Sequence, residues 1–211
     1  MTLLGSWLTA NRAYAIADGR AVRPGPNGQS SSFETDKFNK SPHHPLSWGV
    51  INDPSPGAWF SQWLEAQDTL GEDWPSLAAQ IRAEWMAIRG REMADLRKGW
   101  AIEARERWPP ELETPNNELV VIGYIGEHPG AVATGIHGTT VLDQPGVEFF
   151  GPWRNHAWGA WAVMERLDMG ADLGSESVLR DLLEPLCEHL NHLYLPLNIW
   201  EMSPDGRWKK L

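Results

Sequence analysis

The chain has 211 residues, of which 42% are hydrophobic and 22% charged, so it can bury a substantial core. Its formal net charge of −10 argues against a nucleic-acid partner, because proteins that bind nucleic acids gather lysine and arginine on one face. The single cysteine, Cys187, excludes an internal disulfide and a zinc site built from thiolates, and indicates a reducing compartment. We therefore expect one cytoplasmic domain over residues 1–211, with no metal and no other cofactor.

The first apolar stretch, residues 3–17, predicts two strands rather than a targeting segment. Asn11 and Arg12 interrupt it, whereas a signal peptide has basic residues first and then an unbroken apolar core. No apolar run in the chain reaches the roughly 18 to 20 residues needed to cross a bilayer, so we expect no membrane partner. The predicted strands cover residues 3–8 and 12–17.

A loop, a third strand and a first helix follow. Gly25–Ser32 is rich in glycine and serine and predicts a loop. Residues 46–52 predict a strand that ends at Asp-Pro-Ser-Pro-Gly. Ser55 is a candidate N-cap, with Pro56 at the first position of a helix that runs to about residue 66.

A second helix is predicted from Asp73, since apolar residues recur at helical spacing as far as Ile88. Gly90 weakens this helix, and a further amphipathic stretch continues to about Trp108. The remaining predicted elements are strands at 118–125, 131–136 and 147–150, helices at 153–167 and 175–194, a strand at 197–202 and a short last strand after the turn at 203–206.

The order of the elements predicts an α+β fold. Helices come in pairs between blocks of strands, which favours two antiparallel sheets with helices on both outer faces. We therefore expect a four-layer αββα sandwich.

The N-terminal residues carry a resemblance to a known family. Thr2 would head the chain if Met1 were removed, and Asp18 follows sixteen residues later in Ala-Asp-Gly-Arg. This spacing and order of elements resembles the N-terminal nucleophile hydrolases, in particular the proteasome β-subunit and HslV-like group. In that family a lysine follows at the start of a strand. Lys37 is the better match and Lys40 the alternative.

The resemblance implies a threonine peptidase. A threonine hydroxyl is a weak nucleophile, and the free α-amine of Thr2, with an ordinary pKa of roughly 7.7 to 8.0, could take its proton. Lys37 would supply positive potential and Asp18 would orient it. The backbone N–H around Asn52 would stabilise the oxyanion, and Arg20 would lie beside the substrate.

Three departures from the family pattern favour an alternative without catalysis. Gly151-Pro152-Trp153 stands where the family has Gly-Ser-Gly, and the Asp and Ser expected near the threonine are not evident in residues 191–195. The glycine expected at the oxyanion position is replaced within residues 50–53. The alternative is an inactive proteasome-like subunit that builds a ring or shell.

Thirteen tryptophans are more than one small domain needs. Helical stripes that include Trp59, Trp63 and Trp85 predict subunit contacts, because large exposed apolar patches mark interfaces. We expect a homo-oligomeric ring or double ring that takes peptide or protein substrates, with an unfoldase as a further partner. A glycan-binding module is a third hypothesis, and it requires exposure of these tryptophans: Trp7, Trp48, Trp100 and Trp208.

Overall fold

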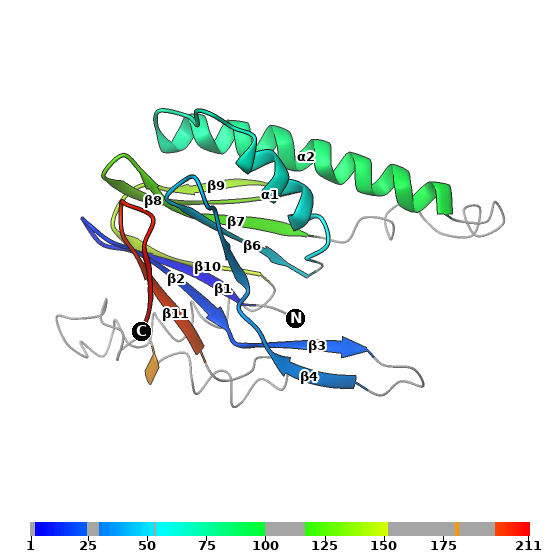
Figure 1. Cartoon of the computed structure of the whole chain (residues 1–211), viewed down its shortest axis with the longest axis horizontal. Coiled ribbons are helices and arrows are strands. Elements are labelled where there is room, and N and C mark those ends of the chain that lie inside the picture. The colour runs from blue at the N-terminus through cyan, green and yellow to red at the C-terminus, as the bar shows by residue number, and fades with distance from the viewer. Residues whose placement is uncertain (1–2, 25–29, 53, 100–116, 152–179, 182–196) are drawn as a thin grey trace.

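A computed structural model describes residues 3–24, 30–52, 54–99, 117–151, 180–181 and 197–211. Its centre consists of two stacked antiparallel sheets of five strands each, with two helices on the outer face of one sheet (Figure 1). Within the described ranges, no helix is sufficiently long and apolar to span a membrane.

The first sheet holds both ends of the described chain. Its strand order is β10-β1-β2-β11-β12. The bounds of its strands are Leu4–Leu8 for β1, Ala13–Asp18 for β2, Gly146–Phe150 for β10, Leu197–Met202 for β11 and Trp208–Lys210 for β12.

The second sheet has the order β5-β6-β7-β8-β9, and a separate hairpin pairs β3 with β4. The bounds are Phe38–Lys40 for β5, Leu46–Ile51 for β6, Glu118–Ile125 for β7, His128–Gly135 for β8, Gly138–Leu142 for β9, Arg20–Pro24 for β3 and Ser30–Glu34 for β4. The hairpin projects from the stacked sheets, as Figure 1 shows at the lower right.

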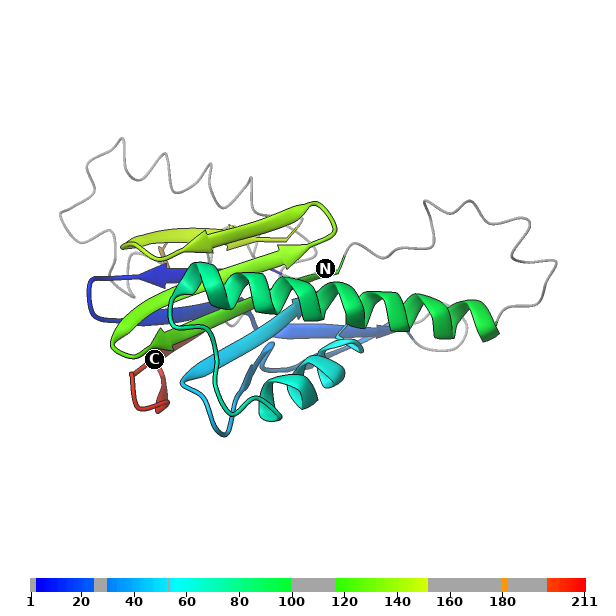
Figure 2. The same ribbon diagram turned by 90° about the horizontal axis from the view of Figure 1, so that it is seen from above.

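The side chains of the second sheet contribute to two cores, one on each face of the sheet, because successive side chains in a strand point to opposite faces. In β7, Val120, Ile122 and Tyr124 pack between the sheets, whereas Leu119 and Val121 pack under the helices. The helices are α1 (Gly57–Glu65) and α2 (Trp74–Gly99). Seen from above, α2 lies across this sheet and extends past it (Figure 2).

The predicted α+β architecture of two antiparallel sheets is confirmed. The strands predicted at 3–8, 12–17, 46–52, 118–125 and 197–202 correspond to β1, β2, β6, β7 and β11. The helices predicted at 153–167 and 175–194, which would make the fourth layer, lie outside the described residues.

Several local predictions are wrong. Part of the predicted loop Gly25–Ser32 belongs to β4, and the strands β3 and β9 were not predicted, whereas β5 confirms the strand expected after Lys37. The helix α1 is capped at Pro56 and not at Ser55. The helix α2 does run through Gly90 and on to Gly99, where the sequence predicted that a helical stretch continues past this glycine.

Candidate active site

The hairpin β3–β4 brings Asp18 and Lys37 together although they are nineteen residues apart. Asp18 is the last residue of β2, and β3 starts two residues later. The chain returns along β4, and Thr35 N–H donates to the Gly19 carbonyl at 2.9 Å, which closes the base of the hairpin. Lys37 then lies directly before β5. The two charged residues therefore flank the base of one hairpin.

The Asp18 carboxylate contacts both Lys37 and the start of the chain. The Lys37 ammonium Nζ donates to Asp18 Oδ2 at 2.6 Å, and the Leu3 N–H donates to Asp18 Oδ1 at 2.8 Å. Asp18 is fully buried, and the Lys37 side chain is 8% exposed. The Leu3 nitrogen is bonded to the carbonyl carbon of Thr2, so the carboxylate binds the peptide unit next to the expected nucleophile.

Burial dominates the electrostatics of this carboxylate. It raises the pKa of Asp18 above the usual 3.8, because a charged group loses its hydration inside the protein. The Lys37 ammonium and the Leu3 N–H favour the carboxylate and offset only part of that rise in pKa. The pair is therefore held in place by the fold at some expense of stability, which is typical of functional sites.

The structure distinguishes between the two candidate lysines. Lys40 points away from Asp18, and its Nζ lies 5.1 Å from the centre of the Trp208 ring. Only Lys37 of the two contacts Asp18. Thr2 lies outside the described residues, so its approach to the pair stays a prediction.

Asn52 and Arg20 are the remaining sequence-predicted site residues. Asn52 follows β6 directly, is exposed, and has a φ of 76°, the one positive φ among the described residues other than glycine. A non-glycine residue in this region is strained, and such residues cluster at functional sites. Arg20 is the first residue of β3 and pairs in register with Glu34.

Sequence reasoning missed the Leu3 amide. No side-chain motif identifies a backbone N–H, although the register of β1 against β2, with Leu4 opposite Ala17, places Leu3 beside Asp18. Among the described residues, no group of three or more His, Cys, Asp or Glu side chains could hold a metal ion.

Most described tryptophans lie in the interior, among them two of the four on which the glycan-binding hypothesis depends. Trp7 is 8% exposed and stacks on Tyr14 at 4.0 Å, and Trp48 is 7% exposed. Trp85 is fully buried in the core under α2, so it offers no surface to a neighbouring subunit. Trp100 lies outside the described residues.

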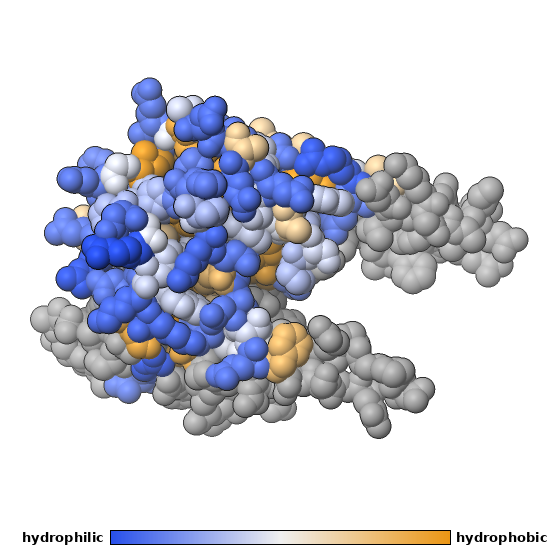
Figure 3. Space-filling model, in the orientation of Figure 1, coloured by the Kyte–Doolittle hydropathy of each residue, from blue (hydrophilic) through white to orange (hydrophobic). Residues whose placement is uncertain are grey.

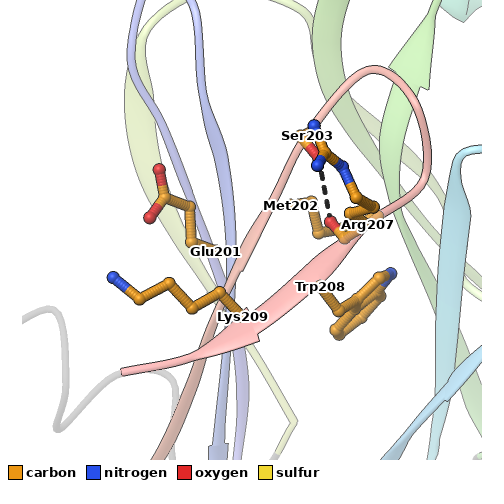
Figure 4. A pocket seen from close by; sticks show the side chains of 6 residues that line it. All are labelled: Glu201, Met202, Ser203, Arg207, Trp208 and Lys209. Atoms are coloured by element: carbon orange, nitrogen blue, oxygen red, sulfur yellow. Dashed lines mark hydrogen bonds between the residues drawn. The ribbon is translucent and has the colours of Figure 1, made fainter.

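Trp208 is half-buried beside a shallow hollow at the turn between β11 and β12 (Figure 4). Met202, which lines this hollow, pairs with Ala13 at the opposite end of β2 from Asp18. At roughly 3.3 Å per residue the two ends of β2 are about 17 Å apart. The hollow is therefore separate from the Asp18–Lys37 pair.

The architecture belongs to a known class of fold, the α+β sandwich built on two stacked antiparallel sheets. Among solved structures, the chain is similar to the Gly-1 mutant of Anbu from Hyphomicrobium sp. strain MC1, with a TM-score of 0.66. The alignment covers 100% of this chain and 87% of the Anbu chain, at 13% sequence identity. No protein-family model matches the chain, and no curated protein sequence matches it. The likeness therefore concerns the fold.

Proposed function

We propose that the chain is a proteasome-like threonine peptidase subunit of a self-compartmentalised ring, with Thr2 as the nucleophile after removal of Met1. One observation carries the proposal. A fully buried carboxylate, Asp18, joins a nearly buried lysine ammonium to the peptide unit that follows Thr2. A purely structural role of this ion pair would not explain why it lies beside the peptide unit that follows Thr2, the proposed nucleophile.

The chemistry follows from the groups present. Thr2 Oγ attacks the carbonyl carbon of the substrate amide while its proton passes to the α-amine of the same residue. When the tetrahedral intermediate collapses, the C–N bond breaks and the proton goes to the leaving amine. Water then hydrolyses the threonine ester by the same route in reverse.

Lys37 supplies the electrostatic part of this mechanism. Its ammonium group is shielded from water, so its positive potential acts on the neighbouring alkoxide with little screening. The same potential keeps the Thr2 amine neutral and therefore basic. Asp18 fixes the direction of the Lys37 side chain through the bond of 2.6 Å.

The end of β6 is the proposed oxyanion site. Asn52 follows the last residue of β6, and its positive φ turns the backbone at the point where the strand ends. A backbone amide at such a turn can donate to an oxyanion.

The test combines intact mass with covalent labelling. Protein from its native host should lack the mass of Met1, and a β-lactone probe should acylate it once. Thr2→Ala should abolish the acylation, whereas the matched variant Thr9→Ala, in the turn between β1 and β2, should keep it. Complete retention of Met1 in the native protein would overturn the proposal.

The second candidate is an inactive proteasome-like subunit that forms a ring or shell. The replacement of the expected oxyanion glycine within residues 50–53 favours it. A ring-sized particle in native mass spectrometry, together with retained Met1 and no labelling of Thr2, would select this candidate over the peptidase.

A further inference from the structure

Gly49 lies at the point where the two sheets meet beside the Asp18–Lys37 pair. It is in β6, in register with Phe38, the residue after Lys37. Its φ is outside the left-handed region, so conformational freedom does not explain a glycine here. The explanation lies in the space around its Cα.

A side chain at position 49 would meet both segments that carry the site. A Cβ there would lie 2.7 Å from the Lys37 carbonyl oxygen and 3.0 Å from Leu4 Cδ1. Leu4 is fully buried in β1, two residues after Thr2. Side-chain carbons do not approach backbone oxygens to 2.7 Å, and the Lys37 carbonyl can move only with the backbone of Lys37 itself.

We propose that Gly49 is a positioning residue for Lys37. Because it has no side chain, the Lys37 backbone packs directly on β6 while Leu4 of β1 reaches the same spot. This contact sets how far the Lys37 ammonium reaches toward Asp18 and toward the start of β1. The effect on catalysis rests on the proposed peptidase function, and the effect on the Asp18–Lys37 geometry does not.

The test is Gly49→Ala, with Gly135→Ala as the matched control. Gly135 lies in β8 of the same sheet, and the nearest atom to a Cβ there is the Asn117 carbonyl oxygen at 3.6 Å, an ordinary contact. If Gly49→Ala does not fold, Gly49→Ala with Leu4→Val is compared with Leu4→Val alone. Both of these variants lack Leu4 Cδ1, so the comparison isolates the contact between a Cβ at position 49 and the Lys37 carbonyl oxygen.

Two measurements separate positioning from stability. The first is the NMR signal of the Lys37 ammonium, whose protons exchange slowly with water only while the buried pair is intact. We expect it in the wild type and in Gly135→Ala, and its loss in Gly49→Ala at a temperature where all three are folded. The second is the β-lactone acylation rate, which should fall about 100-fold in Gly49→Ala, since a misplacement of 1 Å has an effect of this size.

An unchanged ammonium signal and an acylation rate within twofold of the wild type in Gly49→Ala would overturn the positioning role. If the wild type is not acylated at all, the peptidase proposal fails instead. The ammonium signal then still decides whether Gly49 holds Lys37 in place.

Discussion

Asp18 and Lys37 form a buried ion pair in which only the lysine can move its charged group into solvent. The Asp18 carboxylate is fully buried on a short side chain, whereas Lys37 has a long flexible stem and is 8% exposed. A lysine can redirect its ammonium toward solvent when its partner is lost. A buried aspartate has no such escape. The two residues should therefore respond differently to substitution.

Lys37→Met should lower the free energy of unfolding by about 3–5 kcal/mol at neutral pH, because it leaves a buried carboxylate without its cation. Asp18→Asn should lower it by clearly less, since a neutral amide needs no counter-charge. The double variant should recover most of the loss. Urea denaturation of the four proteins measures all three differences. Equal losses for both single variants would contradict the asymmetry.

The loss in Lys37→Met should depend on pH. The folded state raises the pKa of Asp18 above the 3.8 of the unfolded chain, so the folded state holds the proton more tightly. The contribution of Asp18 to stability is therefore complete below about pH 3.8 and is lost as the pH rises through the folded-state pKa. Without Lys37 this pKa rises further. Unfolding curves from pH 4 to pH 8 should show the deficit of Lys37→Met growing with pH, and a constant deficit would disprove the assignment.

The positions of Asp18 and Lys37 at strand ends could be predicted from the sequence, because they depend on the order of the elements along the chain. Asp18 ends a strand and Lys37 precedes one, so the sequence alone places both at the same edge of the fold. The choice between Lys37 and Lys40 could not be predicted, because it depends on the direction of β5. That direction leaves Lys40 against Trp208.

The missed elements have physical causes. The strand β4 begins with three serines and shows no apolar alternation, and its partner β3 provides its hydrogen bonds. In the helix α2, Trp85 and Ile88 lie in the turns before Gly90 and are buried in the core. This tertiary packing outweighs the weak helix propensity of one glycine. Neither the pairing of β4 nor the packing of α2 is visible in a local window of sequence.

Asn52→Ala should destabilise the protein by up to about 1–2 kcal/mol, because asparagine tolerates the left-handed region, where Asn52 has its φ of 76°, better than alanine does. Asn52→Gly should be neutral or slightly stabilising because glycine adopts this φ freely. The matched control is Asn39→Ala, at an exposed strand position with ordinary backbone geometry. Chemical denaturation measures the difference. A loss in Asn39→Ala as large as in Asn52→Ala would point to lost side-chain contacts instead of backbone strain.

Tyr124→Phe should lower the free energy of unfolding by about 1–3 kcal/mol, the range for a buried polar group left without its partner. The Tyr124 hydroxyl accepts the Ala13 N–H at 3.0 Å and lies 3.0 Å from the Met202 carbonyl oxygen, so it joins the two sheets. Tyr14→Phe is the comparison, because the Tyr14 hydroxyl pairs with the exposed Arg12. A smaller loss in Tyr124→Phe than in Tyr14→Phe would contradict the role of Tyr124 as a link between the sheets.

The proposed ring should depend on the outer face of α1. Trp59 and Trp63 are half-buried there and pack at the edge of the core under the helices, whereas Trp85 is enclosed. Figure 3 shows orange and pale orange apolar residues among the polar ones on the upper part of the molecule. Half-buried tryptophans are enriched at interfaces because they combine a large apolar area with a polar N–H group.

Trp59→Glu should therefore shift the particle from a ring to a monomer in light scattering at micromolar concentration, with an unchanged circular dichroism spectrum. Gln62→Glu adds the same charge at an exposed position of the same helix and should leave the particle mass unchanged. A particle of unchanged mass in Trp59→Glu would exclude this face of α1 from the contacts. A wild type that is already monomeric at this concentration would contradict the ring itself, and with it the enclosed chamber on which the proposed peptidase depends.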